Sequence, residues 1–137
     1  MNNEIAGMLL AGARAVVTGA SRGIGEAVAR SLVAAGAQVA LLARNPAPLE
    51  GVARSLGNRA FGIPCDVRDS TAVLRAAAKI TERFEGAPTI LVNNAGVFPF
   101  APLHELTVDD FAAAVDANLV APFRFIRALL PAMQAAR

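Results

Sequence analysis

The residues with the clearest chemical purpose form a glycine-rich turn over Thr18–Gly25, between a short apolar run and an amphipathic segment. Its GxxxGxG glycines permit a tight turn, a close approach of backbone to phosphate oxygens, and close packing of helix on sheet. A helix that starts in this turn offers free N–H groups and a positive dipole end to an anion. The turn therefore predicts a dinucleotide pyrophosphate site formed by Gly19, Ser21, Arg22, Gly23, Ile24 and Gly25.

Two arginines indicate which dinucleotide is preferred. NAD sites place an acidic residue about twenty residues beyond the glycines, on the ribose 2′-hydroxyl. Arg44 stands there in this chain, no acid follows until Glu50, and Arg22 lies within the glycine turn itself. Each arginine alone could be a solvated side chain, but two guanidinium groups at these places suit a 2′-phosphate. We therefore expect NADP(H) to be favoured over NAD(H).

The elements that must position these residues alternate between strands and helices. The last helix is expected to start at a Thr107–Asp110 capping box and to kink at Pro122. This alternation predicts an α/β fold with a parallel sheet, and the Rossmann-type doubly wound order 3-2-1-4 follows by analogy. The expected strands are 14–18, 38–42, 60–65 and 89–92, and the expected helices are 24–35, 46–56, 70–84 and 107–133.

Together these features resemble the short-chain dehydrogenase/reductases, and most closely the 3-oxoacyl-[acyl-carrier-protein] reductase-like members. The resemblance runs from Leu10 to Met133 and covers the N-terminal portion of that fold. It rests on four ordered motifs: Thr18–Gly25, Asp66-Val67, Asn93-Asn94-Ala95-Gly96, and Asn118 within Asp116-Ala117-Asn118-Leu119.

The resemblance also implies roles for individual residues. Asp66 would accept a hydrogen bond from the adenine amino group, and Val67 would lie against the adenine ring. Ala95 and Gly96 would let the backbone lie beside the cofactor, while Asn93 would fix neighbouring strands by side-chain hydrogen bonds. Asn118 would act in catalysis by holding a water-linked proton path, although a polar residue satisfied locally beside Pro122 is the structural alternative.

The family's catalytic serine and Tyr-x-x-x-Lys follow the last helix, and this chain contains no tyrosine and one lysine, Lys79. We therefore expect residues 1–137 to form one NAD(P)-binding domain, truncated within or just after its fourth major helix. General acid catalysis contributes ~10²–10⁴-fold to a rate. A chain without that acid is expected to lack useful dehydrogenase activity alone.

Composition excludes several other classes. The net charge is +2, without a basic stripe or tryptophan, which argues against nucleic-acid binding. No run of eighteen apolar residues is present, so we expect no membrane span. The apolar segment from Ile5 to Ala13 lacks a preceding positive charge and is interpreted as a short leader into the first strand. The single cysteine, Cys65, is expected to be a small buried thiol, and it favours a reduced, cytoplasmic setting. His104 is expected to lie in a loop and to bind no metal.

Three other functions remain open beside an NADP(H)-dependent reductase portion. The chain could be a non-catalytic NADP(H)-binding or interaction module, one half of a split reductase, or a binder of another nucleotide. The last helix is apolar almost all round, which predicts a homo-oligomer or a complementing C-terminal half packed on its apolar face. That face is expected to comprise Phe111, Val115, Leu119, Phe123, Ile126, Leu130 and Met133.

Overall fold

The computed structural model describes residues 9–136. The leader interpretation of residues 5–13 therefore falls partly outside the described residues. Four parallel strands form one sheet in the order β3-β2-β1-β4, which confirms the predicted order. Their bounds are β1 (Arg14–Thr18), β2 (Gln38–Ala43), β3 (Ala60–Pro64) and β4 (Ile90–Val92).

The helices begin at capping residues that the sequence partly predicts. The Asn45 side chain accepts a hydrogen bond from Ala47 N–H, and the Asp69 carboxylate accepts two more at the next helix. The Thr107 hydroxyl accepts from Asp110 N–H at 3.0 Å, as expected for a capping residue. The helical elements are α2 (Gly23–Ala34), α3 (Pro46–Leu56), η1 (Gly57–Arg59), α4 (Ser70–Arg83), α5 (Val108–Val115), the π-helical η2 (Asp116–Val120) and α6 (Ala121–Ala136).

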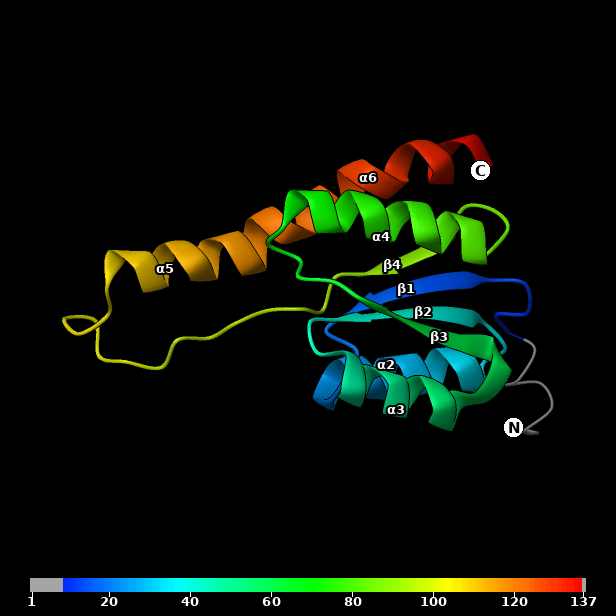
Figure 1. Cartoon of the computed structure of the whole chain (residues 1–137), viewed down its shortest axis with the longest axis horizontal. Helices are drawn as coiled ribbons and strands as arrows, with labels where there is room; N and C mark the ends of the chain where they lie inside the picture. Colours follow the sequence, from blue (N-terminus) through cyan, green and yellow to red (C-terminus); the bar gives the residue numbers. More distant parts are fainter. Residues whose placement is uncertain (1–8, 137) are drawn as a thin grey trace.

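The sheet is covered by helices on both faces, as Figure 1 shows. Alternate strand residues point to opposite faces, so Ala15 and Val17 pack with α2 and α3 while Val16 packs with α4 and α6. The central strands β1 and β2 are almost wholly buried, as expected for a parallel sheet. The segment between β4 and α6, which includes α5, projects away from these layers (Figure 1).

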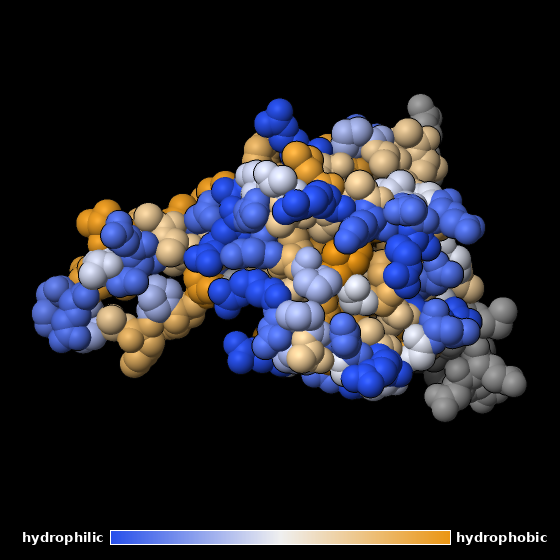
Figure 2. Space-filling view, in the orientation of Figure 1, coloured by the Kyte–Doolittle hydropathy of each residue, from blue (hydrophilic) through white to orange (hydrophobic). Residues whose placement is uncertain are grey.

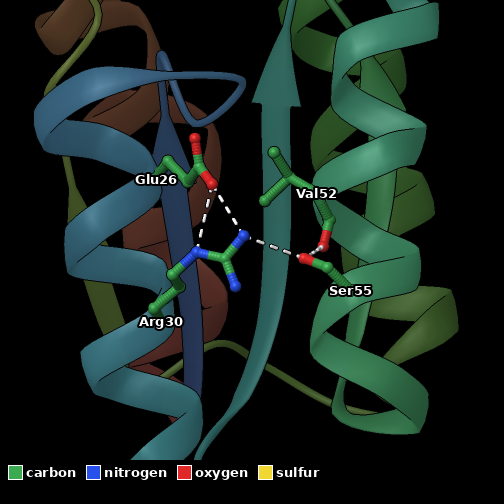
Figure 3. A network of polar contacts seen from close by, with 4 residues as sticks. All are labelled: Glu26, Arg30, Val52 and Ser55. Atoms are coloured by element: carbon green, nitrogen blue, oxygen red, sulfur yellow. Dashed lines mark hydrogen bonds and ion pairs between the residues drawn. The ribbon is translucent and has the colours of Figure 1, made fainter.

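A polar network joins the two helices on the α2 face (Figure 3). The Arg30 guanidinium donates to the Glu26 carboxylate at 2.7 Å, one helical turn away in α2, and to the Ser55 hydroxyl of α3 at 3.0 Å. The Ser55 hydroxyl in turn donates to the carbonyl of Val52. Because these groups are largely exposed, we expect the network to orient the helices more than it stabilises them.

The predicted helix over residues 107–133 is divided into α5, η2 and α6, and its irregular turn lies directly before Pro122. A π-turn occupies Asp116–Val120 directly before the proline, and Ala121 N–H donates to the carbonyl of Asp116, five residues back. Pro122 has no N–H, and its ring would clash with the carbonyl of Asn118 in a regular helix. The wider turn relieves that clash. A second proline, Pro131, lies within α6, where it and Arg127 are exposed.

The structure shows which faces of two helices are buried. In α2 the buried residues are Gly25 and Ala29, whereas Ile24 is 76% exposed. On η2 and α6 the buried residues are Ala117, Ala121, Phe125 and Leu129, of which Phe125 and Leu129 pack in the core cluster against the sheet. The predicted apolar face of the last helix lies largely on the other side, where most of its residues are exposed, which is the side that the sequence predicts to pack on a partner.

This assignment of faces predicts opposite outcomes for two phenylalanines in one helix. Phe125 is 0% exposed and Phe123 is 59% exposed. Phe125→Leu should lower the free energy of unfolding by about 1–2 kcal/mol, because the smaller side chain leaves packing space unfilled. Phe123→Leu, the matched control, should change it by less than about 0.5 kcal/mol. Denaturant melts of both variants, at protein concentrations low enough for the chain to be monomeric, measure the difference, and equal losses would contradict the assignment.

Candidate functional site

A cleft of about 670 Å³ lies at the carboxyl ends of the strands. It is bordered by the glycine turn after β1, by the segments after β2 and β3, and by the loop after β4. Figure 2 shows the surface hollowed between the projecting segment and the body of the molecule. In doubly wound sheets the crevice beside the strand ends, where the order reverses, is where ligands bind. Its volume lies within the range of about 300–1,000 Å³ that is typical of small-molecule sites.

The glycine turn fits the backbone demands expected of it. Gly19 and Gly23 have φ values of +65° and +58°, which favour glycine. A Cβ on Gly25 would overlap the carbonyl oxygen of Gly19 and lie 2.6 Å from Nδ2 of Asn94. Gly25 therefore lets the first turn of α2 lie against the ends of β1 and β4.

Thr18 and Asn94 join β1 to the loop after β4. The Thr18 hydroxyl accepts hydrogen bonds from the N–H groups of Asn94 at 3.1 Å and Ala95 at 3.0 Å. The Asn94 amide donates to the carbonyls of Thr18 at 3.1 Å and Gly19 at 3.3 Å. The bonds between neighbouring strands, which the family resemblance implies for Asn93, thus come from Asn94. Asn93 lies instead beside Pro122 and Phe125, near the other helix layer.

The side of the cleft beneath β2 and β3 is cationic. Arg22, Arg44 and Arg68 line it, with Asp66 as a carboxylate among them. Burial alone would raise the pKa of Asp66, but the backbone N–H and guanidinium of Arg68, with Arg44 further off, outweigh it and lower that pKa. Asp66 is therefore ionised at neutral pH and can accept hydrogen bonds. Its oxygens lie 2.9 Å from Arg68 N and 3.3 Å from the Arg68 guanidinium.

Asn118 lies in the π-turn and reaches the loop after β4. Its Oδ1 accepts from Val97 N–H at 2.8 Å, and its Nδ2 donates to the Val97 carbonyl at 2.7 Å. A Cβ on Gly96 would lie 2.8 Å from the same Oδ1. Both ends of the amide are thus used by a residue far away in the sequence, and the alternative of a residue satisfied locally at Pro122 is not what the structure shows.

Most of the predicted site residues line the cleft, and two others support it. The cleft brings together Gly19, Ser21, Arg22, Gly23, Ile24, Arg44, Asp66, Val67, Ala95 and Gly96. Gly25 supports the turn from behind, and Asn118 holds Val97 at the cleft edge. Sequence reasoning missed Arg68 and Asn94. Arg68 directly follows Asp66-Val67, so a basic residue near a strand end was the available signal.

Cys65 is a buried free thiol, as predicted. Burial, aided by the carboxylates of Asp66 and Asp69, raises its pKa from 9.0 to about 11 against the effect of Arg75. The unfolded chain then loses this proton at lower pH than the folded chain does. The stabilising contribution is complete below pH 9 and is lost as pH rises toward 11.

The predicted consequence is measurable because the chain has no tyrosine and one lysine that titrate in this range. The wild-type free energy of unfolding should fall by on the order of 1–2 kcal/mol more than that of Cys65→Ala across the alkaline range. Denaturant melts at stepped pH measure the two slopes. Parallel slopes would contradict the buried, protonated thiol.

The described residues were also compared with what a metal site and a membrane-spanning helix require. Among residues 9–136, no three His, Cys, Asp or Glu side chains are placed to hold a metal ion. His104 lies in a turn of the loop before α5, as predicted. Over the same described range, no helix is both long and apolar enough to cross a membrane.

Comparison with known proteins gives a consistent picture. The family model described as short chain dehydrogenase matches residues 13–137. The 2,3-dihydro-2,3-dihydroxybenzoate dehydrogenase of Bacillus subtilis is 42% identical over 118 residues, covering 84% of this chain and 45% of that protein. The 3-oxoacyl-[acyl-carrier-protein] reductase MabA of Mycobacterium tuberculosis is 38% identical over 87% of this chain and 44% of its own length.

Among solved structures, a metagenomic short-chain oxidoreductase in complex with NADP has a TM-score of 0.86 and 43% identity. It is covered over 59% of its length, and 93% of this chain is matched. The chain thus spans just under half the length of the curated relatives it matches.

Proposed function

The chain belongs to the short-chain dehydrogenase family, which binds a nicotinamide dinucleotide, and we propose that residues 1–137 are an NADP(H)-binding domain of a carbonyl or 3-oxoacyl reductase. The observation that carries this proposal is the convergence of the glycine turn, three arginines and Asp66 on one cleft. A titration of the purified chain with NADPH and NADH tests it.

The start of α2 supports the placement of the pyrophosphate. Within the described part of the chain, Arg22 at the N-cap position makes no side-chain capping bond, whereas α3, α4 and α5 are capped by Asn45, Asp69 and Thr107. The first N–H groups of α2 are therefore available to an anion, and the helix dipole favours its charge. The absence of a Cβ at Gly23 and Gly25 keeps this approach open.

Strand order suggests how the two nucleosides divide. Arg44 follows β2, and Asp66 and Arg68 follow β3. The glycine turn, with Arg22, follows β1, and the Ala95–Val97 stretch follows β4. The ends of β2 and β4 lie two strand spacings apart, about 10 Å. With the pyrophosphate over β1, the adenosine 2′-phosphate would face the arginines, and the nicotinamide half would lie beside Ala95–Val97.

The bound nicotinamide would supply or accept the hydride, while this chain's own residues bind and orient it. Asn118 is proposed to act in catalysis by maintaining a proton path, and its amide holds the loop beside the expected nicotinamide position. The chain contains no tyrosine to serve as the family's general acid. We therefore expect the 137-residue chain to be inactive alone. Its single free cysteine favours a reducing compartment, for which we propose the cytoplasm.

Inactivity is tested with NADPH and a panel of ketones and 3-oxoacyl thioesters. Turnover within ~10³-fold of the no-enzyme control is expected. Faster turnover would contradict the proposed dependence on residues outside this chain. If the chain is instead one half of a split reductase, adding a separate chain that carries the serine, tyrosine and lysine should restore the rate of carbonyl reduction.

The outward face of the last helices supports a proposed association. Phe111, Leu119 and Phe123 are between 59% and 69% exposed, and Figure 2 shows apolar side chains on the projecting segment. Contiguous apolar surface of this kind marks an interface. We expect a homo-oligomer, or a complex with a complementing C-terminal half, through this face.

The association predicts a specific response to charge. On size-exclusion chromatography with light scattering, the wild-type chain should elute as an oligomer, and Phe123→Asp should shift it toward the monomer. The exposed position should leave the free energy of unfolding of the monomer within about 0.5 kcal/mol. A monomeric wild type would contradict the proposal.

A further inference from the structure

We propose that Arg124 is a positioning residue that holds the β4 side of the cleft in shape for the nicotinamide half of the coenzyme. The proposal rests on the dinucleotide function proposed above. Arg124 lies in the first turn of α6 and does not line the cleft itself. Its influence would pass through the π-turn to the loop that does.

Arg124 fastens three elements together. Its guanidinium donates to Oδ1 of Asp116, the first residue of the π-turn, at 2.7 Å. Its Nε donates to the hydroxyl of Ser70, the first residue of α4, at 3.1 Å. The side chain is 21% exposed, and its Nη1 is buried without a hydrogen-bond partner among residues 9–136. A partly desolvated cation of this kind depends strongly on its one carboxylate partner.

The π-turn connects this ion pair to the cleft. Asp116 accepts both the Arg124 side-chain bond and, through its carbonyl, the π-type bond from Ala121 N–H. Asn118 stands two residues further on and makes two hydrogen bonds to the backbone of Val97. The position of the Val97 backbone therefore depends on the π-turn, which the Arg124 ion pair holds against α4 and α6.

The loop that Asn118 holds is the β4 side of the cleft. It is fixed at its start by Thr18 and Asn94, and at Val97 by Asn118. Beyond Val97 the chain is irregular and largely exposed until α5. Arg44 and Asp66 lie on the far side of β1, and among the described residues neither side chain forms a hydrogen bond with this loop. Loosening the ion pair should therefore weaken contacts of the nicotinamide half and spare those of the adenosine half.

Two ligands separate these halves: NADPH, and 2′,5′-ADP, which carries the phosphorylated adenosine alone. Arg124→Gln should raise the Kd for NADPH about tenfold and leave the Kd for 2′,5′-ADP within about twofold. The matched control is Arg127→Gln, an exposed arginine in the same helix, which should change neither. The fluorescence of bound NADPH, which reports the nicotinamide environment, should move toward that of free NADPH in Arg124→Gln only.

Further variants keep the test decisive. Asp116→Asn should also weaken NADPH binding, and the double variant should bind NADPH no more weakly than Arg124→Gln, because both substitutions remove the same ion pair. Asp116 also acts on the charge of Arg68, so the selectivity between the two ligands is judged on Arg124→Gln. If Arg124→Gln is too unstable to titrate, Arg124→Lys, which keeps the charge beside Asp116, should show a smaller loss for NADPH alone. Equal losses for both ligands, or no loss, would overturn the role of Arg124 while the wild type still binds both. A wild type that binds neither ligand would overturn the proposed function, and this inference with it.

Discussion

Gly25→Ala is expected to abolish measurable coenzyme binding, weakening it by at least ~100-fold, and to destabilise the fold by about 2–4 kcal/mol. The new Cβ would overlap the carbonyl oxygen of Gly19 and crowd Nδ2 of Asn94, which lies 2.6 Å away. Those are the groups that join the glycine turn to the end of β4. To accommodate the methyl group, α2 must move away from the sheet, and its N-terminal N–H groups must leave the cleft.

The sign of the effect makes the experiment diagnostic. In a helix, Gly→Ala ordinarily stabilises by about 0.5–1 kcal/mol. Gly51 lies in α3, and among residues 9–136 no atom beyond its chain neighbours and its own helix backbone lies within 4 Å of the position that a Cβ would take there. Gly51→Ala is therefore the matched control and should stabilise. Thermal melts and NADPH titrations of both variants measure the contrast. Unimpaired binding and stability in Gly25→Ala would contradict the close packing of α2 on the strand ends.

Arg44→Asp is expected to reverse the coenzyme preference, changing the ratio of the NADPH and NADH dissociation constants by about 10²–10³-fold. Loss of one charge-assisted contact accounts for about 1.5–3 kcal/mol, and the new carboxylate would repel the 2′-phosphate while accepting a bond from a free 2′-hydroxyl. Arg44 lies at the end of β2 and lines the cleft together with Arg22. Arg22→Ala should also weaken NADPH binding, but by less than Arg44→Asp does, because it introduces no carboxylate to repel the 2′-phosphate.

A charge control separates this local effect from a change in net charge. Arg127 is exposed on α6 and does not line the cleft, so Arg127→Asp should leave the ratio unchanged. Added salt should weaken NADPH more than NADH in the wild type, because screening acts on the extra phosphate. A ratio near one in the wild type, or one unaffected by Arg44→Asp, would contradict the assignment of the 2′-phosphate to this side.

The elements most accessible to prediction were those with strict local demands. The glycine turn is recognisable because a left-handed backbone at Gly19 and the absence of space at Gly25 leave no alternative residue. Capping residues such as Asn45 predict the start of a helix to within a few residues. The sheet order came by analogy with a known fold, because no local signal distinguishes which parallel strands are neighbours.

The parts that escaped prediction depend on contacts distant in the sequence. Whether Asn93 or Asn94 bonds to β1 depends on which way the chain turns after β4. The sheet-facing side of α6 could not be identified because small Ala121 and large Phe123 both look buried in a helix that is apolar all round. The hydrogen bonds of Asn118 to Val97 span 21 positions in the sequence, so only the fold reveals them.

Calorimetric titration of the folded 137-residue chain with NADPH and with NADH tests most directly whether this cleft holds a 2′-phosphorylated dinucleotide. The expected result is one site per chain that binds NADPH at least about tenfold more tightly than NADH. Circular dichroism on the same sample shows that the protein is folded. Folded protein that releases no heat with either nucleotide, at concentrations up to about 1 mM, would contradict the central claim.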